Sequence, residues 1–309
     1  MPSLRRVIAI TVALFCAISL QAKGDLHLFE VNNKAGKITP LTIEKAFTKG
    51  GLSVDLNSEM NTPFKKQFQK TTFKIFTLMT IHHPKLSIDL VKKYPQAGVL
   101  TPMGVGIYQG LNEDTLHLSL LTSDAQAKIL GSDTKILKEI ENAVLKVINQ
   151  TLPNAKHTIS EDSLKESRKL VTSYEFDLDG EDWEDMKEEV EQLLEAGFEP
   201  FGFVMPSFLD FNEEMTQEGK VDSPYDFYDT YSICKLKVIY TVALSRPEAS
   251  AFAPCTTMVY KKKGEDKIVL GFPAVYNWMS SARVEDKAAH DVLMKAQEDF
   301  ESILIELVE

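Results

Sequence analysis

An internal repeat is the feature of this sequence that most constrains its fold. When the chain is aligned with itself at an offset of 152 residues, nine of the 42 positions from Thr80 to Leu121 are identical, where chance would give about two or three. The identical pairs are Ile81/Ile233, Lys85/Lys237, Pro95/Pro247, Ala97/Ala249, Pro102/Pro254, Tyr108/Tyr260, Glu113/Glu265, Asp114/Asp266 and Leu118/Leu270. Because the prolines, the tyrosine and the Glu-Asp turn keep their order, we expect two copies of one fold.

Each copy shows the same predicted order of elements. A strand and a helix are followed by a second strand, a Pro-initiated turn or short helix, a third strand, a short helix, a strand pair and a long amphipathic helix. We expect Gly50-Gly51 and Gly197 to end the first helix of the two copies, and Pro63 and Pro206 to begin the turns. The predicted strands are 26–31, 52–56, 73–81, 99–108 and 115–121, then 174–178, 198–205, 228–236, 251–261 and 267–272.

This mixture of elements predicts an α+β fold. We expect two tandem two-layer α/β-sandwich domains, each a mostly antiparallel sheet with helices packed on one face. The predicted boundaries are a first repeat domain over 23–150, a linker over 151–170 that is rich in Pro, Asn, Ser and charged residues, and a second repeat domain over 171–309. We expect the two repeats to pair with each other within the chain.

The first 22 residues resemble a secretory signal peptide. Arg5 and Arg6 precede an uncharged, mostly apolar run over 7–20, which is shorter than the roughly 20 residues that a spanning helix needs. With cleavage after Ala22, the mature chain is expected to be periplasmic or secreted and to have no membrane contact. A retained anchor and a twin-arginine signal are the alternatives.

Composition excludes several classes of function. The formal net charge is 34 − 45 = −11, with a pI near 5.2, which argues against nucleic acid as a partner. We interpret the acidic run from Asp177 to Glu189 as acids at a helix N-terminus rather than as a calcium loop. No G-x-S-x-G, P-loop, G-x-G-x-x-G or H-E-x-x-H motif is present, and we propose no catalytic residues.

The centre of the repeat resembles the family known as domain of unknown function 302. That family has a strand ending in Cys-Asn-Pro-Lys-Leu-Ala, a short helix with a Pro near its end, and Leu-Leu-Pro-Cys opening the next strand. Copy one reads His-His-Pro-Lys-Leu-Ser over 82–87 and Leu-Thr-Pro-Met over 100–103, so that both family cysteines are replaced. Copy two keeps both as Cys234 and Cys255 but loses the Asn-Pro. The resemblance implies an α+β fold with a single sheet in each copy, and no established chemistry.

One group of residues has chemical content. Cys234 and Cys255 are 21 residues apart, and so are His82 and Met103, which occupy the equivalent positions in the first copy. Thiolate, imidazole and thioether groups bind soft or borderline metals, so we predict a site for copper or another soft metal at Cys234, Cys255, His82, His83 and Met103. The alternatives are a Cys234–Cys255 disulfide, a reducible dithiol, or unpaired buried thiols. Met103 as a core residue and His82-His83 as the polar end of a strand are the simpler interpretations.

Three functions follow from these observations. The first is a non-enzymatic, exported binding module for a soft metal ion or a small apolar ligand. The second is a thiol-redox or metal-dependent enzyme that uses Cys234 and Cys255, although their wide separation lacks the Cys-x-x-Cys spacing of redox motifs. The third is a purely structural or assembly module.

Overall fold

The computed structural model describes residues 24–165, 169–219 and 222–308; the predicted signal peptide lies outside the described residues. We call 24–165 the first half and 169–308 the second half. The first half contains β1 (Leu26–Asn32), α1 (Pro40–Lys49), β2 (Ser53–Glu59), α2 (Asn61–Phe68), β3 (Phe73–His82), α3 (Pro84–Lys93), the 3₁₀ helix η1 (Pro95–Leu100), β4 (Met103–Gly110), β5 (Thr115–Leu121), α4 (Ser123–Leu130), α5 (Lys135–Thr151) and β6 (Lys156–Ile159). The second half contains β7 (Val171–Asp177), α6 (Trp183–Phe201), β8 (Phe203–Asp210), α7 (Phe211–Gly219), β9 (Tyr225–Lys235), α8 (Leu236–Ala243), the 3₁₀ helix η2 (Pro247–Phe252), β10 (Cys255–Lys262), β11 (Lys267–Pro273), α9 (Tyr276–Ser281) and α10 (Lys287–Val308).

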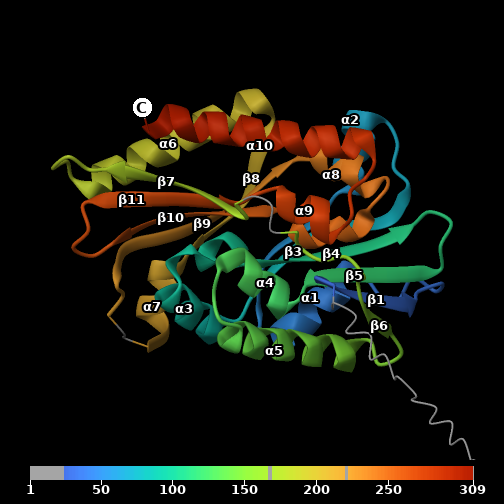
Figure 1. Cartoon of the computed structure of the whole chain (residues 1–309). Helices are drawn as coiled ribbons and strands as arrows, with labels where there is room; N and C mark the ends of the chain where they lie inside the picture. Colours follow the sequence, from blue (N-terminus) through green and yellow to red (C-terminus); the bar gives the residue numbers. More distant parts are fainter. Residues whose placement is uncertain (1–23, 166–168, 220–221, 309) are drawn as a thin grey trace, which may run out of the picture.

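Each half forms one antiparallel sheet. The strand order is β2-β3-β4-β5-β1-β6 in the first half and β8-β9-β10-β11-β7 in the second, so the five repeated strands follow the same order. Figure 1 shows α6 and α10 on one side of the second sheet and α1 and α5 on the far side of the first. The predicted α+β class, with two antiparallel sheets and packed helices, is confirmed.

The register of the central strands repeats at the offset found in the sequence. In the first half, Ile81 of β3 pairs with Met103 of β4, and in the second half Ile233 of β9 pairs with Cys255 of β10. The offset of 152 holds for each pair along the ladder up to Phe76–Tyr108 and Tyr228–Tyr260. It also holds for η1 and η2, whose bounds differ by 152 at both ends. The sequence repeat is therefore also a repeat of strand pairing.

The two halves contact each other reciprocally. The helix η1 packs on β10 and β11, while η2 packs on β4 and β5. At one contact Gly98 of η1 meets Met258 of β10, and at the other Ser250 of η2 meets Gly106 of β4. At the offset of 152, Gly98 corresponds to Ser250 and Gly106 corresponds to Met258, so the two contacts are equivalent with the halves exchanged. This is the pattern of an isologous interface about a two-fold axis.

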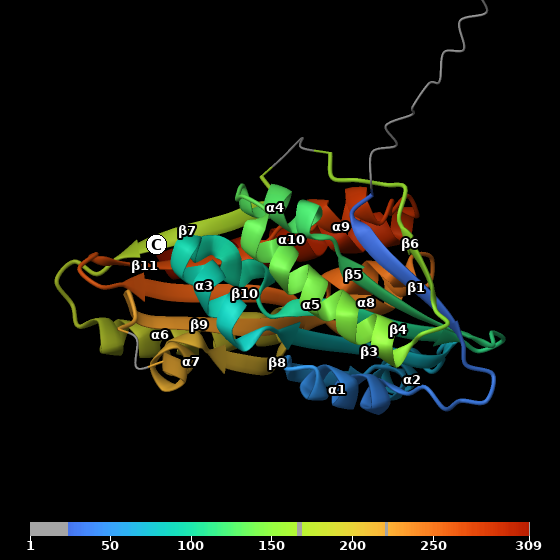
Figure 2. The same cartoon turned by 90° about the horizontal axis from the view of Figure 1, so that it is seen from below.

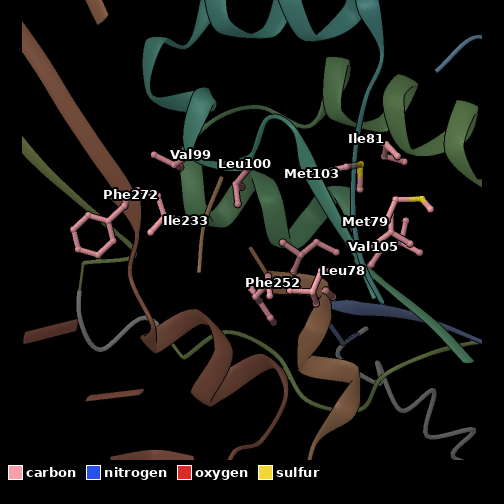
Figure 3. Close-up of a cluster of buried hydrophobic side chains, with 14 of the residues drawn as sticks. Leu78, Met79, Ile81, Val99, Leu100, Met103, Val105, Ile233, Phe252 and Phe272 are labelled. Atoms are coloured by element: carbon pink, nitrogen blue, oxygen red, sulfur yellow. The ribbon is translucent and has the colours of Figure 1, made fainter. Parts of the chain in front are cut away.

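The hydrophobic core continues from one half to the other. Figure 3 shows Val99 and Leu100 of the first half together with Ile233, Phe252 and Phe272 of the second. All five belong to one buried cluster that contains residues from both sheets. Figure 2, turned by 90°, shows α3, α4 and α5 crossing the strands on the side seen from below.

Several predicted boundaries differ from the structure. Gly197 does not end α6, which continues to Phe201 and ends at Gly202 in the left-handed conformation; Gly197 instead allows Ile303 of α10 to approach closely. Pro206 lies inside β8, beside a register shift on this outer strand, where a missing N–H is tolerated. The strands predicted from 99 and 251 begin only at Met103 and Cys255, because η1 and η2 precede them.

The segment predicted as a linker also contains a strand. Residues Lys156–Ile159 form β6, which pairs with β1 at the edge of the first sheet. No helix within the described ranges is long and apolar enough to cross a membrane.

Candidate functional site

An apolar pocket lies in the second half, between strand ends of the sheet and the helices α8, α9 and α10. Its cavity volume is about 40 Å³. The wall consists of Phe203, Ile233, Cys234, Lys235, Val238, Ile239, Cys255, Phe272, Pro273, Val275, Trp278, Leu293, Ala296, Gln297 and Phe300. Only Lys235 and Gln297 in this set bring a charged or amide group, so the wall is almost entirely apolar.

The local sequence explains why the wall is apolar. Helix α10 presents Leu293, Ala296, Gln297 and Phe300 at the i, i+3, i+4, i+7 spacing of one helix face. Helix α8 follows directly on β9 and contributes Val238 and Ile239, which are both buried. The pocket therefore forms where two apolar helix faces meet the end of a sheet.

Both predicted cysteines line this pocket. Cys234 lies one residue before the end of β9, and Cys255 opens β10, where it pairs with Ile233. Both are free thiols. Burial in apolar surroundings raises the pKa of each thiol to about 12, and the neighbouring Cys234 adds to the rise at Cys255. Both groups are therefore protonated at neutral pH, which makes them poor nucleophiles and poor metal ligands until a proton is displaced.

Polar groups occur at the boundary of the pocket. The Lys235 ammonium pairs with Asp299 of α10 at 2.7 Å. Gln297 Oε1 accepts a hydrogen bond from the backbone N–H of Val275 at 3.0 Å. The indole Nε1 of Trp278 is buried and has no hydrogen-bond partner within the described part of the chain. An indole N–H is a donor only, so among the described residues of this wall Trp278 has the one buried side-chain nitrogen without a hydrogen-bond partner.

The equivalent position in the first half has a different environment. His82 replaces Cys234, and its side chain is almost completely buried. Its Nδ1 lies 2.8 Å from Asp55 on β2, and its Nε2 lies 3.0 Å from Glu214 on α7 of the second half. Burial alone would lower the pKa of His82, but hydrogen bonds to the two carboxylates outweigh it and raise the pKa to about 9. His82 is therefore an imidazolium that connects the two halves.

The remaining predicted residues have structural surroundings. His83 is the N-cap of α3, where its Nδ1 accepts from the backbone N–H of Leu86 at 3.4 Å. Met103 is buried and lines a small space shared with Phe252 and Pro254 of the second half. The structure thus brings Cys234 and Cys255 into one pocket and leaves His82, His83 and Met103 in other environments.

The described residues do not form a preassembled set of metal ligands. Over the described residues, no group of three or more His, Cys, Asp and Glu side chains is arranged to hold a metal ion. The copper site therefore stays a prediction, and so does the disulfide, because Cys234 and Cys255 are free thiols in this structure.

Sequence analysis missed a second histidine cluster. His27 Nε2 lies 2.9 Å from the buried Glu141, and His27 Nδ1 lies 2.9 Å from His157 of β6. Burial would raise the pKa of Glu141, but its bonds to His27, to the Lys138 ammonium and to the backbone N–H of Ser123 hold this pKa at about 2. No local pattern could have shown this cluster, because its members are more than 100 residues apart along the chain or lie on different elements.

Comparison with known proteins matches the second half of the chain. A family model described as "Domain of unknown function DUF302" matches residues 184–307, as a single copy. A solved structure, the uncharacterized conserved protein DUF302 from Bacillus stearothermophilus, is similar with 15% sequence identity and a TM-score of 0.36. The match covers 46% of this chain and 100% of that chain. No curated protein matches the sequence. The part of this chain that is similar to the DUF302 family is therefore the part that contains the thiol-lined pocket.

Proposed function

We propose that this protein is an exported, non-enzymatic binding module, and that the apolar pocket of its second half holds the ligand. The observation that carries the proposal is the almost entirely apolar wall, which includes Trp278 with its buried and unpaired indole N–H. Such a wall favours a small apolar ligand, with one acceptor to meet the indole. A water needs about 10–15 Å³, so 40 Å³ admits a few heavy atoms, or the end of a longer apolar chain.

A soft metal ion is the second candidate. The two thiols share one pocket, and sulfur is the donor that copper(I) and related ions prefer. The raised pKa of both thiols opposes this function, because binding must first displace two protons. The same raised pKa opposes a thiol-redox enzyme, which needs a thiolate as its nucleophile.

We also infer that the first half is a second, diverged copy of the domain, and that the two copies pair within the chain. The common strand order, the common register and the reciprocal contacts of η1 and η2 support this inference. Export of the protein rests on the Arg5-Arg6 pair and the apolar run that follows. N-terminal sequencing of the native protein tests it, and a chain that begins at residue 23 is expected.

The pocket is tested with xenon, a single apolar atom that suits a space of about 40 Å³. A ligand that binds only the folded state raises Tm by mass action, so we expect xenon under pressure to raise the Tm of the wild-type protein. Ala296→Leu fills part of the pocket and should abolish the shift. Ala196→Leu, at an exposed position on α6, is the matched control and should keep it. A shift that persists in Ala296→Leu would show that xenon binds elsewhere.

The metal candidate is distinguished with copper(I). Titration of the reduced protein should show no stoichiometric copper binding, and Cys234→Ser and Cys255→Ser should retain the Tm shift caused by xenon. One tightly bound copper that is lost in both serine variants would instead establish the metal site.

A further inference from the structure

The negative charge of this protein is concentrated in one segment. Between Asp177 and Glu199 the sequence has eleven acidic residues and a single basic one, Lys187, so the segment has a net charge of 1 − 11 = −10. The whole chain has 34 − 45 = −11, which leaves 33 − 34 = −1 for all other residues. The acidity is therefore a local property of α6 and the turn before it, and general solubility does not explain this distribution.

Most of this charge is not neutralised within the protein. The ammonium of Lys187 is engaged by Asp229 at 2.6 Å and by Glu191 at 3.6 Å. Within the described ranges, Glu195 and Glu199 have no basic side chain within 4 Å. Both lie towards the C-terminal end of α6, where the helix dipole is negative and where the last turn has no basic residue. Negative side chains are unfavourable at the negative end of a helix dipole, and a bound cation would reduce this repulsion.

Exposed apolar side chains occur on α6 and on the strand β8 that follows it. Of the eight large hydrophobic residues that the described chain exposes, four lie between residues 193 and 208. They are Leu193, Phe201, Val204 and Phe208, with 44%, 37%, 54% and 53% of their surfaces exposed. Single exposed apolar residues are ordinary, but exposed apolar residues that line a groove are typical of an interaction surface. Of these four, Phe208 lines the groove described next.

A groove runs between α6 and β8. Its volume is about 470 Å³, and it is lined by Glu191, Leu194, Glu195, Met205, Pro206, Ser207, Phe208 and Tyr231. Phe208 pairs with Tyr231 across the strands, and the ring centroids are 5.2 Å apart. No basic residue belongs to this lining set. The groove is therefore lined both by the aromatic rings of Phe208 and Tyr231 and by the carboxylates of Glu191 and Glu195.

The first half does not repeat these properties. Its corresponding helix α1 has one acidic residue, Glu44, and two basic ones, Lys45 and Lys49. The strand β2 corresponds to β8. Judged by its pairing with the neighbouring strand, it has the polar, partly exposed Asn57 where β8 has Phe208. Since the fold is common to both halves but the acidic apolar groove is not, the fold alone does not require it.

We propose that the surface formed by α6 and β8 docks a basic amphipathic segment of a partner protein. Lysine or arginine side chains of the partner pair with Glu195 and Glu199, and a large apolar side chain lies in the groove against Phe208. Charge complementarity steers and orients the partner, while burial of Phe208 and its neighbours supplies the apolar part of the affinity. This surface is separate from the thiol-lined pocket, with which it shares no lining residue.

The proposal is tested with a labelled 18-residue peptide that carries lysine and leucine at helical spacing. Fluorescence anisotropy with the full protein should show binding that weakens as salt is added, and no binding of the same peptide with glutamate in place of lysine. The double variant Glu195→Lys/Glu199→Lys should weaken binding at least about tenfold. Phe208→Ser should weaken it several-fold and leave the salt dependence unchanged.

The matched control separates the groove from general electrostatic attraction. Asp89→Lys/Glu139→Lys changes the net charge by the same amount at exposed positions of α3 and α5, and it should change the affinity less than about twofold. Circular dichroism melts verify that each variant folds, and Phe208→Ser keeps the test decisive if the double variant does not. Equal losses in the groove and control variants, or no binding by the wild-type protein at low salt, would overturn the proposal.

Discussion

His82 illustrates how equivalent positions in the two halves can have different roles. In the second half this position is Cys234, whose thiol lines an apolar pocket. In the first half it is a buried histidine, which forms ion pairs with Asp55 of its own half and Glu214 of the other. A buried charged group needs an oppositely charged or hydrogen-bonding partner at each of its polar atoms. His82 meets this condition, because one carboxylate lies at each ring nitrogen. The residue therefore stabilises the contact between the halves.

The His82 ion pairs predict a loss of stability at alkaline pH. Hydrogen bonds to Asp55 and Glu214 overcome the effect of burial and raise the pKa of His82 from 6.5 to about 9 in the folded state. The stabilisation is therefore complete below pH 6.5 and is lost as the pH rises through about 9. We expect the free energy of unfolding to fall by up to about 3 kcal/mol over this interval.

The comparison variant is His82→Gln, measured by urea denaturation at several pH values between 6 and 9.5. It should be less stable than the wild-type protein at pH 6 and should lack the alkaline decrease. His290→Gln, which replaces a more exposed histidine of α10, should retain the wild-type pH dependence. If His82→Gln also retains it, the ion pairs with His82 do not cause the decrease.

At the scale of elements, the packing of η1 against the second sheet requires a glycine at position 98. The backbone N–H of Gly98 donates to the hydroxyl of Tyr228 at 3.0 Å, and the same hydroxyl donates to the carbonyl of Pro95. A Cβ added at Gly98 would lie 2.9 Å from Met258 Cβ and would also collide with Tyr228. Such close approach requires glycine at this position.

Gly98→Ala is therefore expected to destabilise the protein by about 1–3 kcal/mol, because the added methyl group separates η1 from β9 and β10. Chemical denaturation measures this change. Tyr228→Phe keeps the ring and removes only the hydroxyl, so it should relieve part of the clash when combined with Gly98→Ala. Purely additive losses in the double variant would show that the two residues do not interact.

Much of the element order could be predicted from the sequence, because it depends on local periodicity and on the repeat. The strand pairs and the long terminal helices follow from alternating and helical apolar patterns, and the offset of 152 fixes the common register. The boundaries near Gly197 and Pro206 were wrong because tertiary packing decided them: Gly197 packs against Ile303, and Pro206 lies beside a bulge on an outer strand.

The candidate site was predictable only in part. The repeat predicts that Cys234 and Cys255 belong to one site, and both residues line the same pocket. The helix residues that complete the wall, among them Trp278 and Phe300, lie far from the cysteines along the chain, and their amphipathic pattern indicates burial without indicating against what. The partners of His82 could not be found, because Glu214 comes from the other half.

At the scale of the whole molecule, the two halves share one core and should unfold together. Both tryptophans, Trp183 and Trp278, belong to the second half, so tryptophan fluorescence reports on that half while circular dichroism reports on both. Phe47 is fully buried in α1 of the first half. If the continuous core makes unfolding cooperative, Phe47→Leu should lower the denaturation midpoint by the same amount in both signals, which corresponds to about 1 kcal/mol. Leu111→Ala, at an exposed position, should leave both unchanged. A fluorescence midpoint that stays at its wild-type value while circular dichroism becomes biphasic would mean that each half unfolds independently, and that the reciprocal packing of η1 and η2 adds little to stability.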